Sequence, residues 1–132
     1  MIKKTIYYHD TDAGGVVYYA NYLKFMEEAR VEFFHEKGFS ENSAGGRPVF
    51  FPVHRCDIVY HQPARHGDTV LCTARVKDIT PAKIVFQQTV LHHAAKTLLV
   101  EAEVTLACVS ASDFKLMRIP EDIRQAFRPD AG

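Results

Sequence analysis

The sequence has no excess of charge of either sign. Its 16 lysines and arginines are balanced by 16 aspartates and glutamates, so the formal net charge is zero. Such a chain creates no long-range field that would attract nucleic acid or an anionic membrane surface. We therefore expect no nucleic-acid partner, and an anionic ligand would have to be held by a local group of cations.

Long hydrophobic runs are also missing. No stretch approaches the roughly 18 apolar residues that a membrane-spanning helix needs. The N-terminal segment, MIKKTIYYHDTD, lacks the apolar run of roughly 7 to 15 residues found in a secretory signal. The sequence accordingly predicts no membrane span and a cytoplasmic location.

Cysteine is scarce and widely spaced. The three cysteines lie in apolar segments with a strand-like pattern and not in the close pairs of zinc sites or disulfide frameworks. We interpret all of them as buried, small hydrophobic side chains. They are Cys56, Cys72 and Cys108.

The seven histidines do not have metal-ligand spacing. Neighbours such as His92 and His93 point to opposite faces of a strand. His61 and His66 have no clustered carboxylate partner, and the predicted helix carries no HxxxH pair. The sequence therefore predicts no metal site.

Hydrophobic residues are abundant, at 47% of 132 residues. This length and content suit one compact domain. No repeat, composition shift or low-complexity tract divides the chain, and the loosest stretch, residues 40–48, contains two glycines and is predicted to be a loop. We expect a single domain over residues 1–132.

One long amphipathic helix is predicted from about Tyr19 to Lys37, because apolar and charged residues alternate with helical spacing. Gly38 suits the end of this helix, since glycine adopts a left-handed conformation at little cost. A short second helix is predicted after Pro120. The apolar positions are Tyr22, Phe25, Met26, Ala29 and Phe33 in the first helix, and Ile123 and Phe127 in the second.

Alternating patterns predict strands on both sides of the long helix. One strand, Ile2–Tyr8, precedes it, and four follow at about residues 49–60, 68–78, 83–93 and 97–110. In the last, Leu98, Val100, Ala102, Val104 and Leu106 alternate with Leu99, Glu101, Glu103 and Thr105. The connections at residues 79–82 and 94–96 are too short for parallel crossovers, so antiparallel pairing is expected. The fold class is α+β, with one sheet face and the edges left for oligomerisation.

The turn before the long helix carries the functional signal. Residues 7–30 read YYHDTDAGGVVYYANYLKFMEEAR. They closely resemble the signature of the YbgC and 4-hydroxybenzoyl-CoA thioesterase group of hotdog proteins. The resemblance continues through VYHQPAR at residues 59–65 and EAEV at residues 101–104.

The resemblance implies a hotdog fold, in which a curved antiparallel sheet wraps around one long helix. It also implies dimers that join sheets edge to edge, frequent tetramers, and active sites at the dimer interface. The implied activity is hydrolysis of an acyl-CoA thioester. Coenzyme A is then part of the substrate, and no separate cofactor is expected.

By the same resemblance, Asp12 is the catalytic carboxylate. A thioester carbonyl needs a nucleophile or an activated water on one side and hydrogen-bond donors on the other. A carboxylate in a turn that feeds a helix lies beside backbone N–H groups and the positive end of the helix dipole. Gly14 and Gly15 would let the main chain approach the acyl group. Direct attack and activation of water both remain open.

The alternative for Asp12 is a structural one, in which a turn aspartate accepts hydrogen bonds from its own backbone. We assign that structural role to Asp10.

Two tyrosines flank Asp12. Tyr8 matches a tyrosine that lines the site in YbgC-like members, with packing at the strand end as its alternative role. Tyr19 stands where YbgC-like members usually have histidine and the 4-hydroxybenzoyl-CoA branch has tyrosine. Its phenol can donate a hydrogen bond but is a poor acid or base near neutral pH, because its unperturbed pKa is about 10. The predicted site residues are Asp12, Tyr19 and Tyr8.

Three functions compete: a hydrolase of acyl-CoA or acyl carrier protein, a hotdog module that binds acyl thioesters without cleaving them, and a dehydratase. The position of Asp12 favours the hydrolase. The aromatic helix face predicts short-to-medium aliphatic or aromatic acyl groups, and the uncovered sheet predicts a homodimer or homotetramer. Candidate cations for the phosphates of coenzyme A are Arg55, Arg65, Arg75, Lys77, Lys83 and Lys96.

Overall fold

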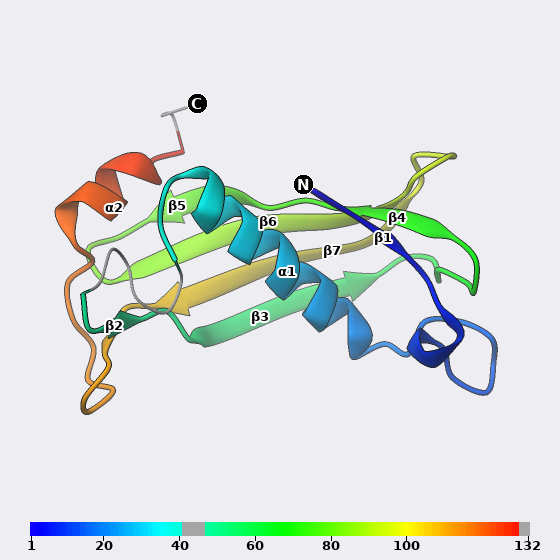
Figure 1. Cartoon of the computed structure of the whole chain (residues 1–132), viewed down its shortest axis with the longest axis horizontal. Coiled ribbons are helices and arrows are strands. Elements are labelled where there is room, and N and C mark those ends of the chain that lie inside the picture. The colour runs from blue at the N-terminus through cyan, green and yellow to red at the C-terminus, as the bar shows by residue number, and fades with distance from the viewer. Residues whose placement is uncertain (41–46, 130–132) are drawn as a thin grey trace.

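The long helix lies across one face of an antiparallel sheet (Figure 1). The computed structural model describes residues 1–40 and 47–129, so most of the predicted loop at residues 40–48 lies outside the described residues. Within the described part, no helix is long and apolar enough to cross a membrane. The elements are β1 (Ile2–Thr5), η1 (Tyr8–Asp10), α1 (Asn21–Glu36), β2 (Val49–Phe50), β3 (Val53–Tyr60), β4 (Thr69–Cys72), β5 (Arg75–Ile79), β6 (Lys83–His92), β7 (Leu98–Ala107), β8 (Val109–Ser110) and α2 (Glu121–Ala126).

In the described part of the chain, six strands form the main sheet, in the order β1-β4-β6-β7-β3, with β5 also paired to β6. All of these pairings are antiparallel, which confirms the prediction from the short connections. A separate two-stranded sheet joins β2 to β8. Among the described residues, strand β3 pairs only with β7 and therefore forms an edge of the main sheet.

Several predicted strands are shorter or divided in the structure. The 49–60 segment is interrupted before Val53 by Pro52, which has no N–H to donate to a ladder. The 68–78 segment is interrupted at residues 73–74, where the hydroxyls of Thr73 and Thr89 lie 2.6 Å apart. The 97–110 segment divides into β7 and β8, and the first strand ends at Thr5 because residues 8–10 form a 3-10 turn.

Strand β7 alternates as predicted over most of its length, with its even-numbered residues from Val100 to Leu106 buried. The pattern fails at Leu99, which is 3% exposed although the alternation placed it on the face of Glu101. The pairing with β6 shifts register here, and this irregularity re-aims the side chain inward.

Helix α1 presents the predicted apolar residues to the core. Tyr22, Phe25, Met26 and Ala29 are buried. Phe33 is half-buried and packs edge-on against other core rings, Phe86 at 5.3 Å and Phe127 at 5.1 Å. The helix ends before Gly38, which has a φ of 86°, and α2 follows Pro120, both as predicted. The α+β hotdog arrangement is confirmed.

A charged residue, Arg30, is also buried on this helix. Its guanidinium donates a hydrogen bond to Oε1 of the fully buried Gln88 at 3.0 Å. The amide of Gln88 in turn donates to the carbonyls of Met26 at 2.9 Å and Thr73 at 3.2 Å. Gln88 thus links α1 to the bend between β4 and β5, and it fixes the helix on the sheet.

The cysteines differ in environment. Cys72 and Cys108 are buried as predicted, and burial raises the pKa of the Cys72 thiol to about 12. Cys56 packs against the core but is only partly buried, so the prediction that it is buried is wrong. The reason is its place on β3, at the edge of the sheet.

Candidate active site

The predicted catalytic turn forms a closed loop between η1 and α1. Thr11 and Val17 pair in an isolated antiparallel bridge, and the N–H of Asp12 donates to the carbonyl of Val16 at 2.9 Å. The N–H of Val17 donates to the carbonyl of Ala64 at 2.9 Å, which docks the loop on the segment after β3. Asp12 therefore lies inside the loop that this bridge closes, next to Thr11, and Tyr19 lies just outside it, after Val17.

The carboxylate of Asp12 is exposed and is held by its own loop. Its Oδ1 accepts the N–H of Gly14 at 2.8 Å. A side chain at Gly14 would bring its Cβ to 3.2 Å from this oxygen, and Gly15 has a φ of 78°. The contact to Gly14 is the one that the structural alternative predicted for Asp12. It engages Oδ1, whereas Oδ2 has no hydrogen bond within the described part of the chain.

The helix begins later than predicted, and Asp10 takes the position beside its start. The side-chain amide of Asn21, the first residue of α1, donates to the carbonyl of Asp10 at 3.2 Å. The carboxylate of Asp10 accepts the N–H of Tyr7 at 2.9 Å. The structural role assigned to Asp10 fits these contacts. The N–H groups closest to Asp12 in the chain belong to the loop and not to the helix.

Tyr19 lies on the wall of a pocket of about 230 Å³. The hydroxyl of Tyr60 donates to the carbonyl of Tyr19 at 3.2 Å, and their rings pack edge-on. The hydroxyl of the buried Tyr22 accepts the N–H of Ala64 at 3.0 Å. Burial raises the pKa of both the Tyr22 and the Tyr60 phenol, so both stay protonated near neutral pH. The pocket is lined by Val17, Tyr19, Tyr22, Tyr60, His61, Gln62 and Pro63.

Tyr8 and Asp12 lie outside the wall of this pocket. The side chain of Tyr8 is 80% exposed, and its ring packs edge-on against His66 with centroids 6.0 Å apart. Within one chain, Tyr19 therefore faces a pocket while the other two predicted site residues are on open surface. Tyr60, His61 and Gln62 were missed as site candidates, although they belong to the VYHQPAR segment that supported the resemblance.

Among the candidate cations, Arg65 adjoins the loop, since it forms an isolated bridge with Val16. Its side chain is exposed. Three others contact neighbours on the sheet: Arg55 with Asp57 at 3.0 Å, Lys77 with Glu103 at 2.6 Å, and Lys83 with His54 at 3.5 Å. Arg75 and Lys96 are exposed elsewhere. No cluster of three or more potential metal ligands occurs among the described residues.

Known proteins share both the motif and the fold. Residues 7–127 match the thioesterase-like superfamily. The chain belongs to this superfamily. It is 37% identical over 123 residues to the acyl-CoA thioester hydrolase YbgC of Escherichia coli, which covers 93% of this chain and 91% of that protein.

Two further relatives agree. The acyl-CoA thioesterase YbgC of Haemophilus influenzae is 33% identical over 123 residues, covering 92% of this chain and 89% of its own. The crystal structure of a probable thioesterase from Bartonella henselae is 31% identical, has a TM-score of 0.82, and covers 90% of this chain and 97% of its own. The resemblance inferred from the loop motif is confirmed.

Proposed function

We propose that this member of the thioesterase-like superfamily hydrolyses acyl-CoA thioesters, with Asp12 as nucleophile or general base. The observation that carries the proposal is the Asp12 carboxylate, which is exposed and fixed through Oδ1 by the N–H of Gly14. Its Oδ2 has no intramolecular hydrogen bond among the described residues, so it is available to attack a carbonyl carbon or to accept a proton from water. The similarity to two acyl-CoA hydrolases supports the same reaction class.

The main chain of Tyr19 supplies the complementary donor. The N–H of Tyr18 donates to the carbonyl of Asp10 at 2.9 Å and that of Asn21 donates to Tyr18 at 2.8 Å, whereas the N–H of Ala20, like that of Tyr19, has no hydrogen-bond partner among the described residues. The N–H of Tyr19 makes no hydrogen bond with any described residue. An available N–H beside a pocket can stabilise the oxyanion that forms on a thioester carbonyl. In this role Tyr19 needs no acidic or basic side chain.

The pocket beside Tyr19 supports a small acyl group. Its volume of about 230 Å³ and its tyrosine walls suit short-to-medium aliphatic or aromatic acyl chains more than long ones. Arg65, which adjoins the loop, supplies a cation for a phosphate of coenzyme A. No separate cofactor is required, because coenzyme A is part of the substrate. We place the reaction in the cytoplasm.

The test is Asp12→Asn, assayed by thiol release from acetyl-, benzoyl- and palmitoyl-CoA and from an acyl carrier protein. Asparagine can still accept the Gly14 N–H through its amide oxygen, so the fold should be kept. An amide is neither a base nor a nucleophile at neutral pH, and kcat should fall by about 10²- to 10⁴-fold. Benzoyl-CoA should have a higher kcat/KM than palmitoyl-CoA.

Asp10→Asn is the matched control, because Asp10 stands two positions away and contacts the helix start. It should lower the melting temperature while leaving kcat close to the wild-type value. If Asp12→Asn kept more than about a tenth of the wild-type kcat, Asp12 would not be the catalytic carboxylate. Equal kcat/KM values for the three acyl-CoAs would contradict the proposed acyl preference.

A further inference from the structure

A small pocket lies at the C-terminal end of α1, where the helix meets the start of β5 and the segment after α2. Its volume is about 150 Å³, and its wall includes Lys37, Arg75 and Arg128. In Figure 1 this end of α1 lies near α2 and β5, whereas the blue loop between η1 and α1 lies at the other end of the helix. The 16 residues of α1 span about 24 Å, so the pocket is well separated from the loop that carries Asp12.

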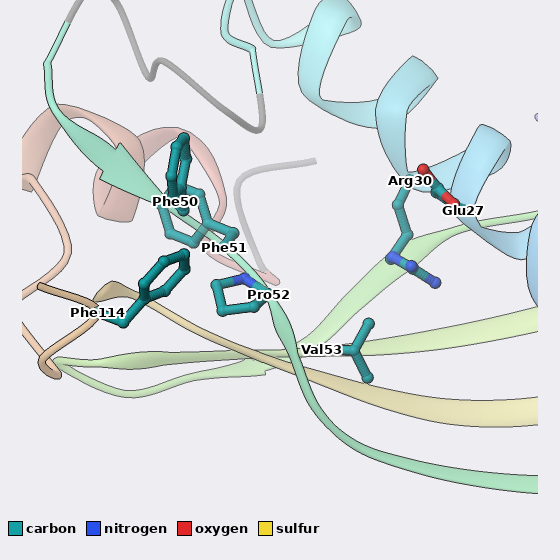
Figure 2. Close-up of a pocket in the computed structure, with 7 residues that line it drawn as sticks. All are labelled: Glu27, Arg30, Phe50, Phe51, Pro52, Val53 and Phe114. Carbon is teal, nitrogen blue, oxygen red and sulfur yellow. The ribbon is translucent and has the colours of Figure 1, made fainter. Parts of the chain in front are cut away.

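All the charged residues of this pocket are basic. Lys37, Arg75 and Arg128 come from three separate segments, and no acidic residue of the described chain lines the pocket. None of the three forms a salt bridge with another described residue. The larger pocket of about 330 Å³ in Figure 2 differs, because its wall holds both an acidic residue, Glu27, and a basic one, Arg30. Like charges around one cavity repel one another, so an anion bound among them would remove an electrostatic cost.

Lys37 by itself has a structural explanation. Its Nζ lies 5.5 Å from the centroid of the Phe33 ring, and a cation near the last turn of a helix is favoured by the helix dipole. That explanation does not extend to Arg75 and Arg128, which lie on other segments and are exposed. The end of α1 opposes an anion only weakly, since the carbonyls of residues 33–35 already accept N–H groups of residues 37–39. A bound anion accounts for all three cations together.

The number of cations favours a phosphate monoester over a carboxylate. A carboxylate carries one charge, which a single arginine fork can match. A phosphate monoester carries about −1.5 to −2 charges near pH 7 and offers three acceptor oxygens, so it can contact donors that come from three directions. The pocket also has an apolar wall, in which the rings of Phe33 and Phe127 pack edge-on at 5.1 Å. An aromatic group attached to the phosphate would cover the part of Phe33 that the chain leaves exposed.

We propose that this pocket binds a phosphate monoester that carries an aromatic group. The phosphate accepts hydrogen bonds from Lys37, Arg75 and Arg128, and the aromatic group packs on Phe33. No residue of the candidate active site lines the pocket, so binding here does not depend on the proposed hydrolysis.

The first experiment is an NMR titration of the full ¹⁵N-labelled chain with phenyl phosphate. The backbone amides of Lys37, Arg75 and Arg128 should shift to saturation, with a Kd of about 1 mM for a ligand of this size. Orthophosphate, which lacks the ring, and benzoate, which carries one charge, should each bind at least about fivefold more weakly. Coenzyme A and its form without the 3′-phosphate distinguish two sources of the phosphate. The source is a separate monoester if neither shifts these amides, and the coenzyme if only the intact form does.

Removal of single cations tests the same site. Arg75→Gln and Arg128→Gln should each raise the Kd for phenyl phosphate by about tenfold, because each removes a charge-assisted hydrogen bond. Both side chains are exposed, so the fold should be kept, and thermal melting checks this. The matched control is Arg65→Gln, an exposed arginine that adjoins the Asp12 loop. It should leave the Kd within about twofold of wild type, because exposed charges at the two ends of the helix are screened from each other.

Several results would overturn the proposal. Failure of the three amides to shift at about 20 mM phenyl phosphate removes the site. Unchanged Kd values in both pocket variants, or weaker binding in Arg65→Gln alone, also remove it, because the phosphate then binds elsewhere. Benzoate that binds as tightly as phenyl phosphate refutes the choice of phosphate, and orthophosphate that does so refutes the contact with Phe33. The expected binding by a protein that cleaves no acyl thioester refutes only the proposed function.

Discussion

The two glycines of the loop that carries Asp12 allow a change in the position of the carboxylate to be separated from a change in loop stability. A methyl group at Gly14 would lie 3.2 Å from Oδ1 of Asp12, a few tenths of an ångström inside ordinary contact. The same oxygen is held by the N–H of Gly14 at 2.8 Å, so Gly14→Ala forces the carboxylate to shift or rotate. A misplacement of about 1 Å can cost about 10²-fold in rate, so a few tenths predicts a loss in kcat of about three- to thirtyfold.

For Gly15→Ala we expect the opposite result, a loss of stability with kcat retained. Gly15 has a φ of 78°, and a Cβ there meets no described atom within 4 Å. The left-handed conformation costs an alanine roughly 1–2 kcal/mol. For a chain of this size the melting temperature should fall by about 2 to 8 °C per kcal/mol, while kcat should stay within about twofold of wild type.

Both variants are measured side by side by thermal melting and by thiol release under saturating acyl-CoA. The two effects should be opposite: Gly14→Ala loses activity with little change in stability, and Gly15→Ala loses stability with little change in activity. If Gly14→Ala retained the wild-type kcat within twofold, the position of Oδ1 would not matter for the reaction. The proposed role of the Gly14 contact in positioning the carboxylate would then be refuted, whereas the assignment of Asp12 itself is tested by Asp12→Asn.

Two further variants test the support of the site. Gln88→Leu removes the buried amide that accepts the Arg30 hydrogen bond and donates to Met26 and Thr73, so it should destabilise the fold by about 2–5 kcal/mol in urea unfolding. A loss below about 1 kcal/mol would show that Gln88 does not fix the helix on the sheet. Tyr19→Phe keeps the main-chain N–H and the ring contact with Tyr60, so it should keep kcat within several-fold. A loss of more than about 10²-fold would assign the role to the phenol and not to the N–H.

Much of the fold could be predicted from the sequence, because the responsible signals are local. The apolar face of α1, the stop at Gly38 and the start of α2 after Pro120 depend on spacing and on backbone preferences of single residues. The loop motif identified Asp12 and Tyr19 as candidates in the same way, and the structure places Tyr19 on the wall of a pocket. Each of these features can be recognised within a window of a few residues.

The features that were missed depend on neighbours that are distant in the sequence. Leu99 turns inward because β6 and β7 shift register, and Arg30 is buried because Gln88, far along the chain, supplies its acceptor. The DTD pattern gives no indication of which carboxylate contacts the helix, since that depends on where Asn21 lies in the folded loop. Alternation predicts that a segment is a strand but not which strands lie beside it.

Strand β3 carries residues whose environment was hard to predict. Cys56 was predicted to be buried but is only partly buried, and Tyr60 was not predicted to line a pocket. Among the described residues β3 pairs only with β7, so the side chains at its free edge lack the cover that a second neighbouring strand gives. Alternation identifies the segment as a strand, but its place at the edge of the sheet depends on its pairing with β7, far along the chain.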